Sequence, residues 1–302
     1  MNNKNTPQIN RRKFLEQSAV LGAAAALPLG AFAADAPAPA AKSIRRASDV
    51  IELGPTKIKV SRMGVGTGTY GAGHSSNQIR ALGVNGVADM LTAAYDKGVF
   101  LWDTADAYGT HEAVKAALKK VPRDKVTIVT KTDAWTSDKA KEDIDRFLKE
   151  LGTDYIDILL LHTRLRTNWD ELDKEAMVVM SEAKKKGVLR AVGMSCHSVG
   201  AMKTAANCDW LDICMARLNP AGERMDAEPE VVLPAVLDVR AKGKGVIGIK
   251  VLGEGTLVED RLDEALKYAL TKNALHCFSL GCESTAQVMD NINRIEKLAV
   301  PA

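Results

Sequence analysis

Short apolar runs alternate with longer segments of helical periodicity along most of this 302-residue chain. The apolar runs are typical of buried parallel strands, and the longer segments carry apolar residues at the spacing of one helix face. Strands are expected at residues 61–66, 100–102, 126–130, 156–161, 188–194, 211–216, 246–251 and 275–280. Among the segments that follow them, helices are expected at residues 138–151, 174–186, 229–242, 258–270 and 284–298.

This alternation predicts an α/β fold with a parallel sheet and right-handed crossovers. Eight strand–helix units in a chain of this length favour a single closed (β/α)₈ TIM barrel over an open sheet. Residues 50–60, with Gly54-Pro55 in the middle, predict an N-terminal β-hairpin that caps one end of the barrel. No second domain is expected.

One motif suggests a different fold. Gly66-Thr-Gly-Thr-Tyr-Gly71 matches G-x-G-x-x-G, the dinucleotide fingerprint of an open doubly wound sheet. That fold needs a helix directly after the motif, whose N-terminus meets the pyrophosphate. Residues 72–85 are instead rich in Gly, Ser and Asn, and a helix is expected only near Gly86. The motif is therefore interpreted as a flexible loop near a cofactor, and residues 66–86 as a candidate lid.

Three successive predicted strands deliver ionisable side chains to their carboxyl ends. The first leads into Asp103 and then Tyr108, the second into Lys131, and the third into His162. In a parallel α/β protein these ends meet at one face, where catalytic groups collect. Taken singly, each residue has a structural explanation: a helix cap, a packing residue, a solvated strand end or a buried histidine. Together they predict one catalytic site.

The segments around these residues also resemble a known family. Trp-Asp-Thr-Ala-Asp-Ala-Tyr-Gly from residue 102, Thr-Lys from residue 130 and Asp-Tyr-Ile-Asp-Ile-Leu-Leu-Leu-His from residue 154 resemble the aldo-keto reductases. The resemblance covers about residues 51–298. It implies hydride transfer between a nicotinamide cofactor, NADP(H) or NAD(H), and a small carbonyl or alcohol substrate. It also implies a catalytic tetrad of Asp103, Tyr108, Lys131 and His162, in which Tyr108 is the general acid or base.

The chemistry of the tetrad follows from the proton that the reaction needs. A free tyrosine, with a pKa of about 10, is a weak acid at neutral pH. A lysine cation at ~4 Å and an effective dielectric near 20 would stabilise the phenolate by about 4 kcal/mol. Lys131 is therefore expected to lower the pKa of Tyr108, while Asp103 keeps Lys131 charged and in place. His162 is expected to orient the carbonyl oxygen.

Later strand ends extend the resemblance and imply an extended cofactor over the carboxyl-terminal face. The expected cofactor-binding residues are Gly66, Thr67, Ser195, Cys196, Arg217, Lys250, Val251, Gly253, Gly281, Gln287, Asp290 and Asn291. Gln287 stands where many members have an arginine for the 2′-phosphate, and Glu283 adds a negative charge nearby. A preference for NADP(H) is therefore expected to be weak or reversed.

The substrate side is expected at Trp135, Arg164 and Arg166. The two arginines follow His162 and favour an anionic or polyol substrate, with solvated loop charges as the alternative. Two other functions stay open. One is a barrel that binds the cofactor for sensing and turns over negligibly; the other is a lyase that uses Lys131 or Lys250 as a Schiff base. Substrate identity, oligomeric state and physiological direction are left open by the sequence.

The first 33 residues predict a twin-arginine (Tat) export signal. Asn-Arg-Arg-Lys-Phe-Leu from residue 10 precedes an Ala-rich stretch at residues 19–32, and Ala31-Phe-Ala33 offers a cleavage site. The stretch is too short for a membrane span and Pro28 interrupts it. The expected partner is the Tat export machinery, and the expected location is periplasmic or otherwise exported, without stable membrane insertion. Residues 34–48 predict an Ala/Pro-rich linker before a barrel domain at 49–302.

Charge and cysteine content limit the kinds of partner, metal site and cross-link that are expected. The formal net charge is +3, and the charged residues before residue 34 account for all of it. A body with no net charge gives no indication of nucleic acid or an anionic membrane as partner. The five cysteines are odd in number and form no C-x-x-C pair, so neither a metal site nor a disulfide framework is expected.

Overall fold

The structure is a computed structural model that describes residues 44–302. The predicted export signal and residues 34–43 of the predicted linker lie outside the described residues. The last part of that linker contacts the barrel: Ala47 is fully buried, and its carbonyl accepts a hydrogen bond from the Met63 amide at 3.0 Å. Within the described residues, no helix is both long and apolar enough to span a bilayer.

Eight parallel strands close into a barrel in chain order, and the last strand pairs back with the first. The strands are β3 (Met63–Gly66), β4 (Leu101–Asp103), β5 (Thr127–Thr132), β6 (Ile156–Arg164), β7 (Leu189–Cys196), β8 (Ile213–Arg217), β9 (Gly245–Ile249) and β10 (Cys277–Gly281). The predicted TIM barrel is confirmed, with each expected strand found within a few residues of its predicted bounds. The closed barrel excludes the open-sheet interpretation of the glycine motif.

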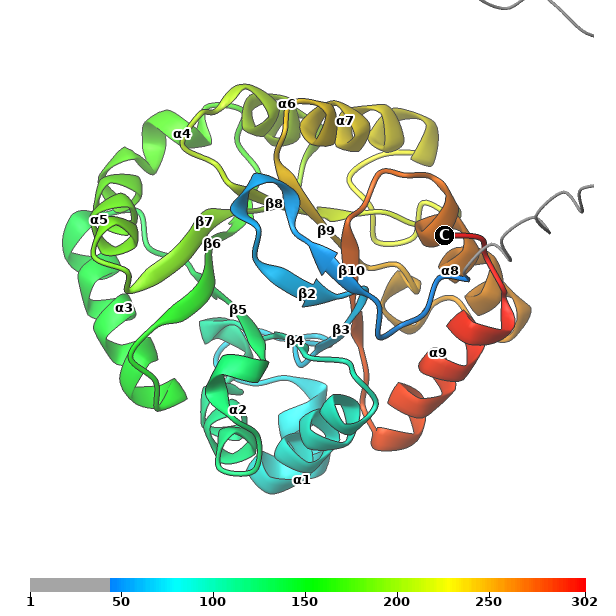
Figure 1. The fold of residues 1–302 in the computed structure, drawn as a ribbon. Coiled ribbons are helices and arrows are strands. Elements are labelled where there is room, and N and C mark those ends of the chain that lie inside the picture. Colours follow the sequence, from blue (N-terminus) through cyan, green and yellow to red (C-terminus); the bar gives the residue numbers. More distant parts are fainter. Residues whose placement is uncertain (1–43) are drawn as a thin grey trace, which may run out of the picture. The chain divides into compact units, whose positions relative to one another are not determined.

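Helices surround the barrel (Figure 1). They are α1 (Asn77–Asp96), α2 (His111–Leu118), α3 (Ser137–Leu151), α4 (Trp169–Leu172), α5 (Lys174–Lys185), α6 (Val199–Asn207), α7 (Pro229–Ala241), α8 (Asp260–Thr271) and α9 (Thr285–Lys297). The five predicted helices are all present.

The start of α1 corrects one expectation in part. Helical turns already begin at Asn77, where the Ser76 hydroxyl caps them by accepting a hydrogen bond from the Ile79 amide. Gly83, with φ of 63°, breaks the helical backbone, and the longer segment of α1 follows it, close to the expected start near Gly86. The candidate lid at residues 66–86 is therefore a loop only as far as Ser76.

Alternation along the strands separates two layers of core. Leu101, Val129 and Ile158 pack inside the barrel, whereas their neighbours on the strands, such as Trp102, face the helices. Successive strand residues point to opposite sides, so Asp103 shares the inward face of Leu101. By the same rule Lys131 follows Val129 inward, and His162 follows Ile158 and Leu160. The core pattern thus directs three ionisable side chains into one end of the barrel, called here the mouth.

The opposite end, called the hairpin end, is closed by β1 (Val50–Glu52) and β2 (Lys59–Ser61), which pair antiparallel as predicted. Figure 1 shows this hairpin lying across the barrel opening. Its Leu53 is fully buried among the inward-facing strand residues. The hairpin seals the interior, which leaves the mouth as the accessible end.

Leu53→Ala is expected to lower the free energy of unfolding by about 3 kcal/mol, because it removes a buried side chain from the seal and leaves a cavity. Chemical denaturation measures the change. Val50→Ala is the matched control: Val50 lies on the same hairpin but is 60 % exposed, and its loss should change stability by less than about 0.5 kcal/mol. Equal effects of the two substitutions would show that the hairpin does not seal the barrel.

Candidate active site

Four predicted catalytic side chains meet at the mouth. The Lys131 ammonium donates hydrogen bonds to Asp103 Oδ1 at 2.5 Å and to the Thr104 carbonyl at 2.9 Å. Tyr108 ends a short 3₁₀ turn, Asp106–Tyr108, which follows β4. Its hydroxyl lies 3.5 Å from His162 Nε2, and Lys131 Nζ lies 4.7 Å from the centre of its ring. The cation therefore lies over the face of the phenol ring, and the histidine lies beside its hydroxyl.

Burial sets the protonation of this group. It raises the pKa of Tyr108, and the nearby Lys131 cation offsets the rise only in part. Burial opposes the charge on Lys131, but Asp103 and then Tyr108 outweigh it and hold the pKa of Lys131 above its ordinary value. Burial and the Lys131 charge lower the pKa of His162 well below its ordinary value, so this imidazole is neutral. Lys131 thus acts on Tyr108 in the expected direction, but the net shift is upward.

The glycine motif makes room for the Tyr108 ring. A Cβ atom at Gly68 would lie 2.2 Å from the ring, and one at Gly71 would lie 2.4 Å from it. Any larger residue at either position would displace the phenol. The motif was expected near the cofactor, and Gly66, Gly68 and Thr69 do line the cleft described below; its contact with the Tyr108 ring was not expected.

Ser279 completes the buried ion pair and was missed from the sequence. Its hydroxyl donates a hydrogen bond to Asp103 Oδ2 at 2.8 Å, while Oδ1 accepts from Lys131. Ser279 lies on β10 and is 4 % exposed. A serine inside the apolar run of the last strand was the only available signal, and buried polar side chains generally have such a partner.

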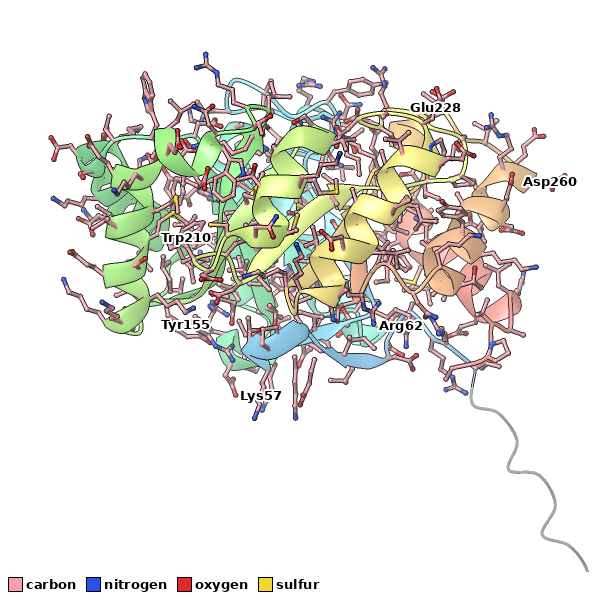
Figure 2. All side chains as sticks on the ribbon, turned by 90° about the horizontal axis from the view of Figure 1, so that it is seen from above. Lys57, Arg62, Tyr155, Trp210, Glu228 and Asp260 are labelled. Atoms are coloured by element: carbon pink, nitrogen blue, oxygen red, sulfur yellow. The ribbon has the colours of Figure 1, made fainter. Side chains whose placement is uncertain are left out.

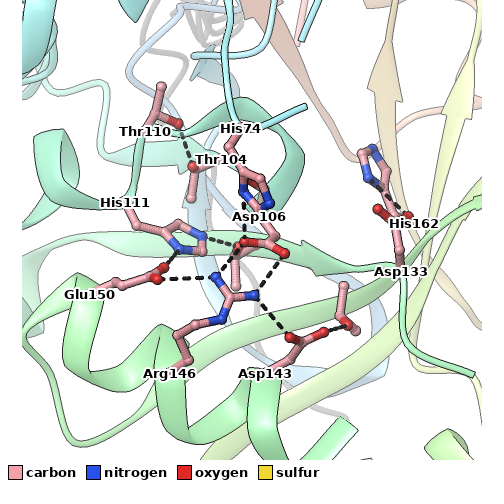
Figure 3. A network of polar contacts seen from close by, with 12 residues as sticks. His74, Thr104, Asp106, Thr110, His111, Asp133, Asp143, Arg146, Glu150 and His162 are labelled. Atoms are coloured by element: carbon pink, nitrogen blue, oxygen red, sulfur yellow. Dashed lines mark hydrogen bonds and ion pairs between the residues drawn. The ribbon is translucent and has the colours of Figure 1, made fainter. Parts of the chain in front are cut away.

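Arg146 binds the carboxylates of Asp106, Asp143 and Glu150 (Figure 3), and through Asp106 it holds the turn that carries Tyr108. Its two terminal nitrogens donate to the two carboxylate oxygens of Asp106 at 2.7 and 2.8 Å, and also to Asp143 and Glu150. Asp106 is the first residue of the turn that ends at Tyr108. A bidentate guanidinium–carboxylate contact fixes orientation as well as distance. On α3, Asp143 and Arg146 lie at i, i+3 spacing and Arg146 and Glu150 at i, i+4 spacing, which is the signal of this network in the sequence.

His111 extends this network toward β5. Its Nδ1 lies 2.7 Å from Glu150 Oε2, and its Nε2 lies 2.7 Å from the hydroxyl of Thr130, the residue before Lys131. The hydrogen bond with His111, together with Arg146, lowers the pKa of Glu150 to about 2. Oxygen and nitrogen atoms of Asp106, His111 and Glu150 lie within 4.8 Å of one another, as metal ligands would. Because Arg146 binds both carboxylates, the cluster is an ion-pair network.

A cavity of about 340 Å³ extends from Asp103 and Tyr108 past the ends of β9 and β10 to α9. We call it the cofactor cleft. Seven of the expected cofactor-binding residues line it: Gly66, Lys250, Val251, Gly281, Gln287, Asp290 and Asn291. Lining residues that the sequence analysis did not assign to cofactor binding include Thr69, Glu254, Ser279 and Glu283. A cleft of this size that starts at the tyrosine suits one end of a nicotinamide dinucleotide, and the glycines at two strand ends allow a close approach to backbone.

The other five expected cofactor-binding residues do not line this cleft. Thr67 is buried, and its hydroxyl donates to the Asp103 carbonyl. Gly253 occupies a left-handed turn position, with φ of 60°. Ser195 is buried beside His197, and burial raises the pKa of the Cys196 thiol to about 12. Arg217 forms an ion pair with Asp226, a carboxylate that the sequence analysis missed.

Two loops meet at the cleft. The Lys250 ammonium forms an ion pair with Glu254, which lies on the same loop after β9. Glu254 also accepts a hydrogen bond at 3.3 Å from the amide of Tyr70, on the loop after β3. The only lysine among the cleft-lining residues is thus already paired, and four carboxylates share the lining with it: Asp103, Glu254, Glu283 and Asp290.

The expected substrate residues lie on the other side of His162. Trp135, Arg164 and Arg166 line a second cavity of about 340 Å³, together with Asp133, whose Oδ1 is 3.6 Å from His162 Nδ1. Trp135 is 66 % exposed and Arg166 is exposed. Arg164 donates hydrogen bonds to Asp173 at 2.6 Å and to the His162 and Ala134 carbonyls at 2.7 Å. These contacts fix it in the wall of the cavity and occupy its guanidinium.

The barrel is closed, and at its mouth a buried Asp–Lys pair lies next to a Tyr–His pair. This arrangement defines the protein as a barrel enzyme with an acid–base site. The sequence profile of the Aldo/keto reductase family matches residues 62–299. The chain belongs to this family. The resemblance seen in the strand-end residues is thereby confirmed over the whole barrel.

Known relatives agree with this assignment. The chain is 29 % identical over 201 residues to the NADH-specific methylglyoxal reductase of Escherichia coli, covering 59 % of this chain and 61 % of the relative. It is 32 % identical over 169 residues to the aldo-keto reductase YhdN of Bacillus subtilis, covering 50 % of this chain and 48 % of the relative. The matches thus span about half to three fifths of these relatives.

The solved structure of aldo-keto reductase AKR11C1 from Bacillus halodurans, in its holo form, has the same fold. It superposes with a TM-score of 0.66 at 21 % identity, and the match covers 84 % of this chain and 97 % of that one. At this level of identity the likeness speaks for the barrel.

Arg146→Met is expected to lower turnover on the order of tenfold, because the turn that carries Tyr108 loses its bidentate contact and the hydroxyl drifts from His162. Steady-state kinetics on the folded fraction measure the loss, which should fall on kcat more than on KM. Arg62→Met is the control, since Arg62 forms a similar two-nitrogen contact with Asp49 at the hairpin end. The positioning role is wrong if both variants lose turnover equally.

Proposed function

We propose that the protein reduces aldehydes or activated ketones with a reduced nicotinamide, and oxidises the corresponding alcohols in reverse. The observation that carries this proposal is the 3.5 Å approach of the Tyr108 hydroxyl to His162 Nε2, with the Lys131–Asp103 pair behind the phenol. A carbonyl oxygen placed between these two groups would accept hydrogen bonds from both. The cofactor, when bound in the cleft, supplies the hydride.

Tyr108 supplies the proton in this proposal. As hydride reaches the carbonyl carbon, negative charge develops on the oxygen, and the phenol transfers its proton there. The phenolate that remains faces the Lys131 ammonium, which stabilises it. Asp103 and Ser279 hold that ammonium in place. The neutral His162 orients the carbonyl oxygen without competing for the proton.

The same contacts argue against the lyase alternative. A Schiff base needs a neutral, accessible amine. Lys131 is 1 % exposed and is held charged by Asp103, and Lys250 is paired with Glu254. The sensing alternative shares the whole site with the reductase, so turnover distinguishes the two.

Tyr108→Phe is expected to lower turnover of small aldehydes by at least about a hundredfold, because the ring stays and only the proton donor is lost. Cofactor binding should be unchanged, which fluorescence titration with NADH and NADPH would check. Methylglyoxal is a suitable first substrate, since the Escherichia coli relative is named for it. Near-normal turnover by the variant would remove Tyr108 from the mechanism, and no turnover by the unaltered protein would favour the sensing role.

The pH profile of the unaltered protein gives a second check on the same assignment. Reduction needs protonated Tyr108, and its raised pKa keeps the proton in place until the pH passes above about 10. The lowered pKa of His162 leaves no titration near pH 6.5. The reduction rate should therefore be flat across neutral pH and fall only in strong alkali.

We also propose that NADH serves at least as well as NADPH. Gln287 and Glu283 line the cleft where a 2′-phosphate would need cations, and the Gln287 side chain is occupied by the Glu283 amide at 2.7 Å. Asp290, nearby on the cleft, pairs with Arg294, which also binds Asp263. The cleft therefore offers like charge to the extra phosphate.

Gln287→Arg is expected to tighten NADPH binding by about tenfold and leave NADH binding nearly unchanged, because a charge-assisted contact contributes about 1.5–3 kcal/mol. Gln287→Met is the matched control, which removes the amide without adding charge. Dissociation constants from fluorescence titration measure both. A hundredfold preference of the unaltered protein for NADPH would contradict the proposal and point to another cation.

We propose that the chain is exported by the twin-arginine route to the periplasm with its cofactor already bound. The support is the sequence of residues 1–33, together with a barrel that needs a nucleotide made in the cytoplasm. At a dissociation constant near 1 nM and an association rate of about 10⁶ M⁻¹s⁻¹, the bound lifetime would be about a quarter of an hour. Longer retention needs closure over the nucleotide, for which the loop after β3, linked through Tyr70 to Glu254, is suited.

Protein from the periplasm is expected to carry close to one nucleotide per chain after extensive dialysis, as mass spectrometry would show. Replacing both Arg11 and Arg12 by Lys should keep the protein in the cytoplasm. Periplasmic protein recovered empty, with micromolar affinity for added cofactor, would rule out export with bound nucleotide. Export that persists without the two arginines would rule out the route.

A further inference from the structure

The hairpin end of the barrel carries a concentration of cations. Lys57 and Lys59 lie on the hairpin, and lysines and arginines dominate three of the loops that lead into strands at this end, at residues 119–125, 184–190 and 240–244. Figure 2 shows Lys57 and Arg62 at this end of the molecule. The cations come from segments far apart in the sequence, and only the closed barrel brings them to one face.

The mouth carries the opposite charge. Its loops hold a majority of carboxylates, among them Asp133, Glu228, Glu254, Asp260 and Glu283. Glu228 and Asp260 lie toward the end opposite Lys57 in Figure 2. The near-zero net charge of the barrel is therefore the sum of a basic hairpin end and an acidic mouth. Net charge alone does not reveal this separation of charge along the barrel.

Helix dipoles account for only part of this separation. In this barrel the helices end toward the hairpin end, where cations near their C-termini are favourable. Lys57 and Lys59, however, lie on the hairpin, which contains no α-helix. Moreover, five exposed lysines of this end have no carboxylate within ion-pair distance among the described residues: Lys57, Lys59, Lys119, Lys185 and Lys186. Their charges are not neutralised within the described barrel.

We propose that the hairpin end docks on an anionic phospholipid surface, with the mouth turned away from it. The position of the chain entry selects this partner. Ile44 pairs with Pro301, and the Arg45 amide donates to the Val300 carbonyl, so the chain joins the barrel at the hairpin end. The residues that precede this point carry the export signal proposed above, and the choice of partner rests on that proposal, because export would bring the protein to a membrane. Cations near an anionic bilayer are attracted within a Debye length.

The docking surface is independent of the reaction, and its test needs no turnover. The full-length chain is sedimented with vesicles of about three parts phosphatidylcholine to one part phosphatidylglycerol, and with pure phosphatidylcholine vesicles, at about 0.1 M and about 0.5 M salt. The export signal is present in every sample, so differences between variants report the barrel surface. The test variant replaces all five unpaired lysines by Glu.

The control variant replaces five exposed cations that lie away from the hairpin end: Lys139, Lys141, Lys174, Lys203 and Arg261. It has the same net charge as the test variant, so general repulsion from the vesicles is matched. A third variant, with the five hairpin-end lysines changed to Gln, tests charge without reversal. Thermal melting confirms that each variant is folded.

The unaltered chain should partition onto the anionic vesicles more than onto the neutral ones, and the higher salt should remove the difference. The Glu variant should lose at least about tenfold in partitioning and the Gln variant less, whereas the control should change little. Equal losses by the Glu and control variants would overturn the proposal. Binding of a short DNA duplex as strong as vesicle binding, and equally sensitive to the five lysines, would also overturn it by showing a nucleic-acid surface.

Discussion

The Lys131 ammonium lies inside the barrel and is 1 % exposed, so its charge must be neutralised by groups that the fold holds in place. Asp103 from β4 supplies the counter-charge, Thr104 supplies a carbonyl, and Ser279 from β10 holds the carboxylate. These contacts join residues far apart in the chain. Asp103 gains its Ser279 contact only after β10 has paired with β3, so this set of contacts is complete only when the barrel is closed. The orientation of the Asp103–Lys131 ion pair therefore depends on barrel closure.

Much of this arrangement could be predicted because it follows from short-range patterns. Strand runs and their carboxyl ends are local features, and alternation along β4, β5 and β6 aims Asp103, Lys131 and His162 inward. Features that depend on the partner of a side chain could not be predicted. Arg164 follows His162 as expected, yet its contacts with Asp173 and two carbonyls occupy it. Gly68 has its role because the Tyr108 ring lies against it, which no spacing in the sequence reveals.

The two cavities divide the mouth at the reacting pair. The cofactor cleft begins at Tyr108 and runs under the loops after β9 and β10, whereas the second cavity begins beside Asp133 on the far side of His162. Tyr108 lines the cofactor cleft, and Asp133, which lines the second cavity, lies against His162. The loops that form the two cavities follow different strands. Substitutions in the loops of either cavity can therefore occur without disturbing the buried Asp103–Lys131 ion pair.

Both ends of the described chain leave the barrel at the sealed face, where Ile44 and Pro301 pair. An added protein, a solid support or an electrode linker could therefore be attached at residue 44 or residue 302 without covering the opening through which substrate enters. Circular permutation is also favourable, since a short connector could join two ends that already touch. New termini could then be placed in a loop at the mouth, and the catalytic end would become the end from which the protein is anchored.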